Sequence, residues 1–277
     1  MALDAGNGLV YWGDPTGSVI QVGNADGSGL PSDLYNAGDG VGGPCGLALD
    51  VAGNKIYFTD PSASLVRVAN LDGSGGMTTL FNGGDGLGNP LSIKLDASGG
   101  VLYWTDTTTV KIQSGLTSGV GAPIDLYVAG DGLIGPADVA LDVGGNLLYW
   151  TDSLTDKVQV GNLDGSSTPP TDLFDSGDGL SNPFGLDIDL AGGTLYWADS
   201  GSVTINSGST AGSGSGAPVA LFGAGDGLGF PFDVAIDAAG SVGMPVSSVW
   251  SILVTAMAIA LAGSGIVLVG RTRRARG

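Results

Sequence analysis

The chain has 277 residues, of which 52 are Gly and 43% are hydrophobic, so it is long enough to bury a large core. All 27 acidic residues are Asp, and there is no Glu. Because Asp and Gly favour turns whereas Glu favours helices, this composition indicates an all-β fold with many tight turns. His is absent and Cys occurs once, which removes the commonest general base and excludes an internal disulfide framework.

The charge is divided unequally along the chain. Residues 1–242 contain all 27 Asp against five basic residues, a balance of −22, whereas the last seven residues contain four Arg. An acidic body of this kind repels the phosphates of nucleic acids, so nucleic acid is excluded as a partner. The same charge is compatible with cations or with basic partners.

A four-residue phrase recurs five times at a nearly constant spacing. Its copies begin at positions 11, 57, 103, 149 and 196 and read YWGD, YFTD, YWTD, YWTD and YWAD. A fixed period of about 46 residues is typical of stacked supersecondary units. Within the second period, four short segments rich in β-branched and aromatic residues, at 46–50, 55–60, 65–70 and 78–81, read as strands. Four antiparallel strands per repeat predict one blade of a β-propeller.

The number of blades depends on the two ends of the repeat region. The chain opens inside a first strand at 2–4, and another first strand at 232–237 follows the fifth complete repeat. We therefore expect a propeller domain over residues 1–240 with five complete four-stranded blades. We also expect a six-bladed ring in the full-length protein, with the missing strands and an export signal encoded upstream.

A second phrase, containing Gly-Asp-Gly, links each fourth strand to the next first strand. In a propeller this link lies on the face that usually binds ligands, so its aspartates are expected to ring one mouth of the channel. Carboxylates that lie close together repel unless cations neutralise them, and Ca²⁺ prefers oxygen ligands. None of these loops has the alternating spacing of a calcium loop, so capping of the turn is the preferred role. The aspartates are Asp39, Asp85, Asp131, Asp178 and Asp226.

Departures from the repeat are better candidates for a specific function than the repeat itself. Two positions after the Pro that ends each link, the copies carry Gly46, Ser92, Asp138, Gly185 and Asp233. Asp138 and Asp233 are expected near the channel mouth, where they either bind a ligand or are solvated channel residues. The aromatic and Asp residues of the four-residue phrase occur in every blade, so we expect them to pack blades together and to cap strand ends.

The C-terminal part has the composition of a membrane segment. Residues 238–270 contain no charged residue, and residues 249–270 would span about 33 Å as a helix, enough for a bilayer core of ~30 Å. The Arg cluster that follows predicts a cytoplasmic C-terminus with the propeller on the other side. We expect a separate tail over residues 241–277, with a transmembrane helix at about 249–270.

Two family resemblances follow from these residues. The YWTD copies, the ALD strands before them and the NLDG turns resemble the YWTD repeat, or low-density-lipoprotein-receptor class B repeat, over about residues 1–240. That resemblance implies a six-bladed propeller that acts as a ligand-binding or structural module. The tail resembles bacterial sorting domains of the PEP-CTERM and IPTL-CTERM type, which implies processing by an exosortase-like protease, although it lacks the Pro-Glu-Pro triplet. The residues that carry the second resemblance are Pro245, Trp250, Arg271, Arg273 and Arg274.

These patterns predict an exported, surface-anchored propeller that binds a protein or glycan ligand without catalysis. No cofactor is expected, with Ca²⁺ as the one ion under consideration. The alternatives are an enzyme on a related six-bladed scaffold, such as a calcium-dependent lactonase or a lyase, and an N-terminally truncated gene fragment. Such enzymes usually draw on Glu, His or Asn side chains in the channel, and Glu and His are both absent here.

Overall fold

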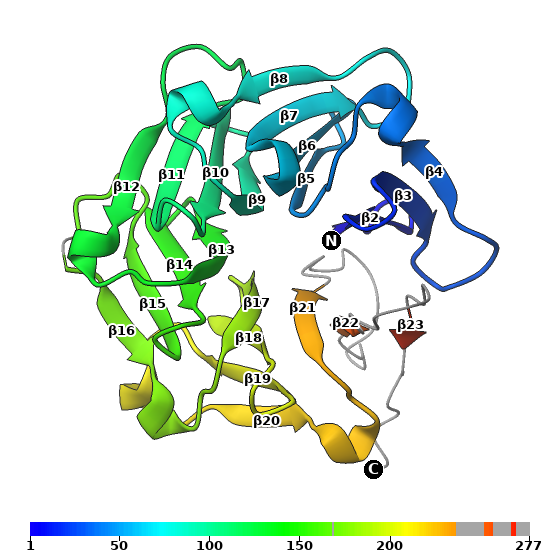
Figure 1. Cartoon of the computed structure of the whole chain (residues 1–277). Coiled ribbons are helices and arrows are strands. Elements are labelled where there is room, and N and C mark those ends of the chain that lie inside the picture. Colours follow the sequence, from blue (N-terminus) through cyan, green and yellow to red (C-terminus); the bar gives the residue numbers. More distant parts are fainter. Residues whose placement is uncertain (168, 237–251, 257–266, 270–277) are drawn as a thin grey trace.

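The computed structural model describes residues 1–167, 169–236, 252–256 and 267–269. These residues form strands and short 3₁₀ turns, and no helix among them is long and apolar enough to cross a membrane. The strands make six antiparallel sheets, which are arranged as a ring around a central axis (Figure 1). The predicted all-β propeller is confirmed.

Five of the sheets are four-stranded blades, in which consecutive strands are neighbours and the first strand lies innermost (Figure 1). Blade 1 contains β1 (Ala2–Asp4), β2 (Leu9–Asp14), β3 (Val19–Asn24) and β4 (Ser32–Tyr35), and blade 2 contains β5 (Leu47–Asp50), β6 (Lys55–Asp60), β7 (Leu65–Asn70) and β8 (Thr78–Phe81). Blade 3 contains β9 (Pro90–Asp96), β10 (Val101–Asp106), β11 (Lys111–Leu116) and β12 (Ile124–Val128). Blade 4 contains β13 (Pro136–Asp142), β14 (Leu147–Asp152), β15 (Lys157–Asn162) and β16 (Thr171–Phe174), and blade 5 contains β17 (Pro183–Asp189), β18 (Thr194–Asp199), β19 (Thr204–Ser209) and β20 (Val219–Phe222).

A three-stranded sheet occupies the sixth position of the ring (Figure 1). In this sheet β21 (Pro231–Ile236) pairs with β22 (Ile252–Ala256), which pairs with β23 (Val267–Val269). The sequence predicts a membrane helix over residues 249–270, whereas the two segments of that range that the structure describes are strands paired next to β21. The membrane helix and the upstream strands both stay predictions. An uncharged apolar segment can either pair with the free edge of β21 or form a helix. The hydrophobicity of the segment alone does not distinguish these two structures. The remainder of the predicted helix and the sorting-motif residues lie outside the described residues.

The tight turn between the first and second strands of each blade requires a left-handed residue directly before the second strand. The φ angle at this position lies between 53° and 65° in all five blades. Only Gly and Asn occupy it, because these residues adopt the left-handed region at the lowest cost. The residues are Gly8, Asn54, Gly100, Asn146 and Gly193.

The aromatic residues of the YWTD phrase pack neighbouring blades together. Trp104 on β10 is fully buried and stacks on Phe81 of the preceding blade, with ring centroids 5.3 Å apart. Tyr127 and Trp150 make the same contact at the next interface, at 4.6 Å. The phrase repeats because every blade must bury the same face against its neighbour, so the predicted structural role of these aromatics is confirmed.

The Thr and Asp of the phrase fix the inner strands around the axis. The hydroxyl of Thr105 donates to the backbone carbonyl of Ala137 in the next blade (3.0 Å). Asp152, at the end of β14, accepts hydrogen bonds from the backbone N–H groups of Ile134 (2.7 Å) and Gly135 (2.9 Å), which lie in the loop leading to β13. The predicted capping role of this Asp is therefore confirmed, and the cap positions the start of the inner strand.

Each buried indole in blades 3 and 4 donates its N–H to a Gln on the third strand. In blade 4, Trp150 Nε1 donates to Gln159 Oε1 (2.9 Å), and Gln159 Nε2 donates to Asp172 on the outer strand (2.7 Å). Lys157 completes this series through an ion pair with Asp172 at 2.7 Å. The polar series lets a large aromatic residue be buried without leaving its N–H unpaired.

Blade 5 lacks this polar series. Asn206 and Ala220 stand at the Gln and Asp positions, and Asn206 donates to Thr204 (2.9 Å) instead. Within the part of the chain that the structure describes, the buried Trp197 Nε1 has no hydrogen-bond partner. The shorter Asn side chain therefore leaves a buried donor unsatisfied, at a cost of about 1–3 kcal/mol.

We expect the double substitution Asn206→Gln, Ala220→Asp to raise the free energy of unfolding by about 1 kcal/mol, because it gives Trp197 an acceptor. In a chain of this size, that gain corresponds to roughly 2–4 °C in Tm, measured by calorimetry. The matched control is Gln159→Asn in blade 4, which should lower Tm by a similar amount. An unchanged Tm in the double variant, with a lowered Tm in the control, would show that the Trp197 N–H is already satisfied.

Candidate functional site

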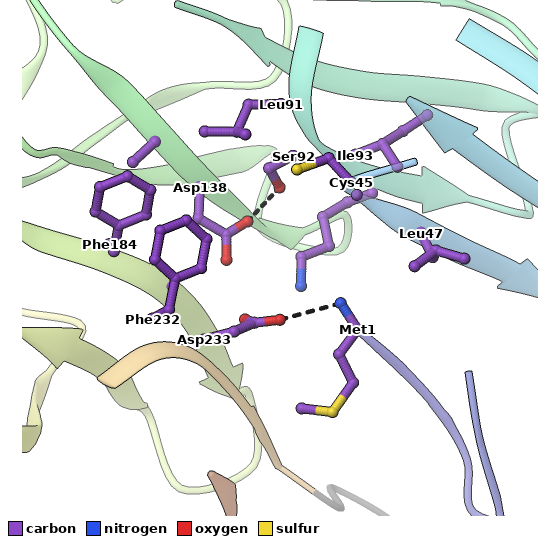
Figure 2. Close-up of a pocket in the computed structure, with 14 residues that line it drawn as sticks. Met1, Cys45, Leu47, Leu91, Ser92, Ile93, Asp138, Phe184, Phe232 and Asp233 are labelled. Carbon is purple, nitrogen blue, oxygen red and sulfur yellow. Dashed lines mark hydrogen bonds and ion pairs between the residues drawn. The ribbon is translucent and has the colours of Figure 1, made fainter. Parts of the chain in front are cut away.

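A pocket lies at the centre of the ring and is enclosed by the inner strands of blades 2 to 5, by β21 and by Met1 (Figure 2). Its empty space of ≈ 460 Å³ includes the solvent at its open side, so the enclosed part is much smaller. A pocket of this size accepts a small molecule or a single projecting group rather than a folded partner. Its polar and aromatic lining residues are Ser92, Lys94, Asp138, Asp233, Phe184 and Phe232.

Asp138 ties three inner strands together. Its Oδ1 accepts a hydrogen bond from the N–H of Val139 (2.8 Å) and another from the hydroxyl of Ser92 on β9 (Figure 2). Its Oδ2 accepts a hydrogen bond from the N–H of Leu186 on β17 (2.7 Å). With only 8% of its surface exposed, Asp138 is a fixed acceptor whose oxygens already face donors of the protein.

Lys94 brings a positive charge into the same pocket from β9. Burial opposes this charge, but the carboxylates of Asp138, Asp187 and Asp233 outweigh burial and raise the pKa of Lys94 above its ordinary value. Lys94 therefore remains an ammonium ion at any physiological pH. Within the described residues this ammonium has neither a hydrogen bond nor an ion pair, so its three donors remain open to a ligand.

The pKa of Asp138 is also shifted. Burial raises the pKa of this carboxyl, the charge of Lys94 opposes the rise, and the charge of Asp233 adds to it. The pocket therefore contains the ammonium of Lys94 and the amino group of Met1 among acidic groups that disfavour one another's charge.

Asp187 repeats the geometry of Asp138 one blade further on. Its Oδ1 accepts from the N–H of Ile188 (3.0 Å), and its Oδ2 accepts from the N–H of Ile236 on β21 (2.8 Å). Sequence reasoning missed both Lys94 and Asp187. The signal that finds them is the position four residues after the loop Pro, which reads Ala48, Lys94, Ala140, Asp187 and Ala235 in successive repeats.

The structure places both predicted channel residues, Asp138 and Asp233, in the pocket (Figure 2). Asp233 lies on β21, where its Oδ1 accepts from the N–H of Val234 (2.8 Å) and its Oδ2 forms an ion pair with the amino group of Met1 (3.0 Å). Beside these carboxylates, Phe184 and Phe232 pack against each other with ring centroids 4.3 Å apart. A role of Asp138 and Asp233 in ligand binding remains a prediction.

The five Gly-Asp-Gly aspartates do not ring the channel mouth, so that expectation of position is wrong. They end short 3₁₀ turns, which directly follow the outermost strands and lie at the outer rim of the ring (Figure 1). Only the later residues of each link carry the chain inward, so the aspartates stay at the rim. The turns are η1 (Ala37–Asp39), η3 (Gly83–Asp85), η4 (Ala129–Asp131), η5 (Ser176–Asp178) and η7 (Ala224–Asp226).

Each of these aspartates caps its own turn. The Oδ2 of Asp131, for example, accepts from the N–H of Val128 (3.0 Å), and the other four make the same bond at 2.9–3.2 Å. Among the described residues, no three acidic or Cys side chains gather closely enough to hold a metal ion. The preferred reading of the sequence, turn capping, therefore fits the geometry better than a calcium ring.

Calcium should accordingly give no specific stabilisation. We expect Tm in CaCl₂ to equal Tm in NaCl of matched ionic strength, because both salts merely screen the acidic body. The measurement compares EDTA, CaCl₂ and NaCl for the wild type and for Asp131→Asn. A rise in Tm that only CaCl₂ produces, and that Asp131→Asn reduces, would support a cation site, because an ion that binds only the folded state raises its stability.

Comparison with known proteins relates this fold to solved structures. The chain matches no protein-family model and no curated protein. Among solved structures it is similar to a chain of a nidogen/laminin complex, with a TM-score of 0.63 and 28% identity over 73% of this chain and 72% of that chain. Together with the repeated phrase, this similarity supports a YWTD-type β-propeller fold.

Two bacterial enzymes share the fold alone. A virginiamycin B lyase from Staphylococcus aureus has a TM-score of 0.61 and 16% identity, over 92% of this chain and 76% of that chain. A gluconolactonase from Xanthomonas campestris has a TM-score of 0.58 and 19% identity, over 77% of this chain and 69% of that chain. Structures similar to this chain thus include both a binding complex and enzymes.

Proposed function

We propose that this protein is a noncatalytic binding module that recognises a protein partner with the face on which the central pocket opens. The observation that carries the proposal is a set of exposed and half-buried apolar side chains at the ends of three neighbouring sheets on this face. We call it the apolar arc. It consists of Ile134, Leu154, Phe184, Phe230 and Phe232.

The apolar arc belongs to three consecutive positions of the ring. Pairing of Pro136 with Asp152 places the loop that contains Ile134 and the turn that contains Leu154 at the same end of blade 4. Exposed fractions are 54% for Ile134, 70% for Leu154 and 41% for Phe230. Exposed apolar patches rimmed by polar residues are typical of interaction sites.

The charge of the propeller indicates the chemistry of the partner. Because the body carries −22, a partner with an apolar centre and a basic rim would associate fastest and with the least competition from acidic proteins. The similarity to a chain of a nidogen/laminin complex supports a protein as the partner. The enzyme alternative has less support, since the oxygens of Asp138 already accept hydrogen bonds from the protein and are poorly placed to exchange protons with a substrate.

Photo-crosslinking tests the face that is used. A photoreactive residue at position 154 or 230 should give the same protein adduct in the producing cells, and the adduct at 154 should disappear when Phe230→Asp is added. The matched control position is 190, because Leu190 is 53% exposed in a turn at the opposite end of blade 5. Equal adducts from position 190, or adducts that ignore Phe230→Asp, would contradict the proposed face.

We also propose that the propeller is exported and attached to a membrane through its apolar C-terminal stretch. The absence of charge over residues 238–270 and the Arg residues that follow support this proposal. It competes with the sixth sheet, because a membrane helix at 249–270 would remove β22 and β23 from β21. With the native export signal present, alkaline phosphatase fused after Gly277 should be inactive, and strong activity of that fusion would contradict the proposed topology.

A further inference from the structure

We propose that the central pocket binds a neutral sugar ring. This inference goes beyond the protein-binding face, because it concerns a small molecule in the pocket that opens on that face and that shares only Phe184 and Phe232 with the apolar arc. The first observation is the unused hydrogen-bonding capacity of Lys94. Its ammonium lines the pocket and has no hydrogen bond within the described part of the chain, so it can donate up to three hydrogen bonds to a bound molecule.

The charges around the pocket select a neutral ligand. The ammonium of Lys94 and the amino group of Met1 face the carboxylates of Asp138 and Asp233 in the pocket, and Asp187 lies near enough to act on Lys94. An anion that approached Lys94 would therefore be repelled by these carboxylates. A cation would meet the ammonium of Lys94 itself. A neutral hydroxyl group avoids both repulsions, since it can accept a hydrogen bond from Lys94 and donate one to a carboxylate.

The aromatic pair supplies the other half of sugar recognition. Phe184 and Phe232 lie beside Asp138 at the edge of the pocket, and their rings are tilted by 32° (Figure 2). A pyranose ring has an apolar face of C–H groups and an edge of hydroxyl groups. The pair can cover the apolar face while Lys94 donates to one hydroxyl and the remaining lone pairs of Asp138 and Asp233 accept from others, and the open pocket suits one such ring.

The acceptors are held in place before any ligand arrives. Backbone N–H groups fix Asp138 at 2.7 and 2.8 Å, and another fixes Asp233 at 2.8 Å. Binding therefore requires little ordering of these side chains, which is the condition under which a small polar ligand gains most from its hydrogen bonds.

The test uses the full chain and the methyl glycosides of glucose, galactose, mannose and N-acetylglucosamine. Titration calorimetry and ligand-observed NMR should show saturable binding of at least one of them. Lys94→Met and Phe232→Ala should each weaken that binding about tenfold or more, because each removes a contact worth at least ~1.4 kcal/mol. Leu190→Ala, in an exposed turn, should bind as the wild type does.

Tm and near-UV circular dichroism establish that each variant is folded. If Lys94→Met does not fold, Phe232→Ala alone tests the site. Methylguanidinium and acetate are the charged probes and should not compete with the glycoside. The proposal is overturned if no glycoside binds the folded wild type saturably, if folded pocket variants bind as well as it does, or if a charged probe binds instead. Crosslinks from positions 154 and 230 are read independently, so failure of the sugar site leaves the protein-binding face separately testable.

Discussion

Replacing Asp152 by alanine should lower the free energy of unfolding by about 3–5 kcal/mol. The side chain is fully buried and accepts hydrogen bonds from four backbone N–H groups, two in the loop before β13 and two in the turn after β14. Removal of the carboxylate leaves these donors without an acceptor and frees the loop that sets the position of the inner strand. Urea denaturation measures the loss.

The matched control is Asp131→Ala at the outer rim. That carboxylate caps an exposed turn with one bond to the N–H of Val128, so its loss should cost about 1 kcal/mol or less. The comparison separates the aspartate that caps the outer turn after blade 3 from the aspartate that ends the second strand of blade 4. Equal losses of unfolding free energy in the two variants would show that Asp152 does not fix the loop before β13 more strongly than Asp131 fixes its turn.

Replacing Lys94 by methionine should cost about 2 kcal/mol at neutral pH. The substitution removes the cation that offsets the carboxylates of Asp138, Asp187 and Asp233, of which Asp233 keeps its ion pair with the amino group of Met1. Loss of a direct buried ion pair costs about 3–5 kcal/mol, and Lys94 makes no such contact among the described residues, so the smaller value is expected. Lys157→Met, which breaks an exposed ion pair with Asp172, is the control and should cost about 1 kcal/mol or less.

The cost of Lys94→Met should depend on pH. Because burial raises the folded-state pKa of Asp138, this carboxyl adds stability below its unfolded pKa and loses it as the pH rises through its folded pKa. Without Lys94 the folded pKa is higher still, so the loss on raising the pH is larger in the variant. The deficit should be small near about pH 4 and grow toward about pH 7, and a deficit that grows as the pH falls would contradict the assignment.

The repeat made the fold predictable from the sequence. A phrase that recurs at a fixed interval indicates a contact that every blade makes, and the packing of Trp104 on Phe81 is such a contact between neighbouring blades. The tail was less predictable, because the absence of charge is equally compatible with a membrane helix and with β22 paired to β21. That choice depends on whether an open sheet edge lies nearby, which the local sequence does not encode.

The pocket was predictable only in part. Asp138 and Asp233 stand out because they break the repeat two positions after the loop Pro. Lys94 and Asp187 break it two positions later, on the same side of the inner strands, and a comparison of that position would have found them. Asp138 accepts hydrogen bonds from Ser92 and Leu186, which lie 46 and 48 positions away in the sequence. These bonds therefore become apparent only in the folded ring.

We propose that this propeller binds a partner without catalysis, and an assay of turnover tests that proposal most directly. Purified full-length protein should hydrolyse or cleave no lactone or ester substrate above background, with or without Ca²⁺, because the Asp138 oxygens are held by Val139, Leu186 and Ser92. The assay compares the wild type with Asp138→Asn and Asp233→Asn over a panel of lactones and esters. We expect all three proteins to be indistinguishable from buffer, whereas a robust rate that either substitution abolishes would contradict the account and establish an enzyme.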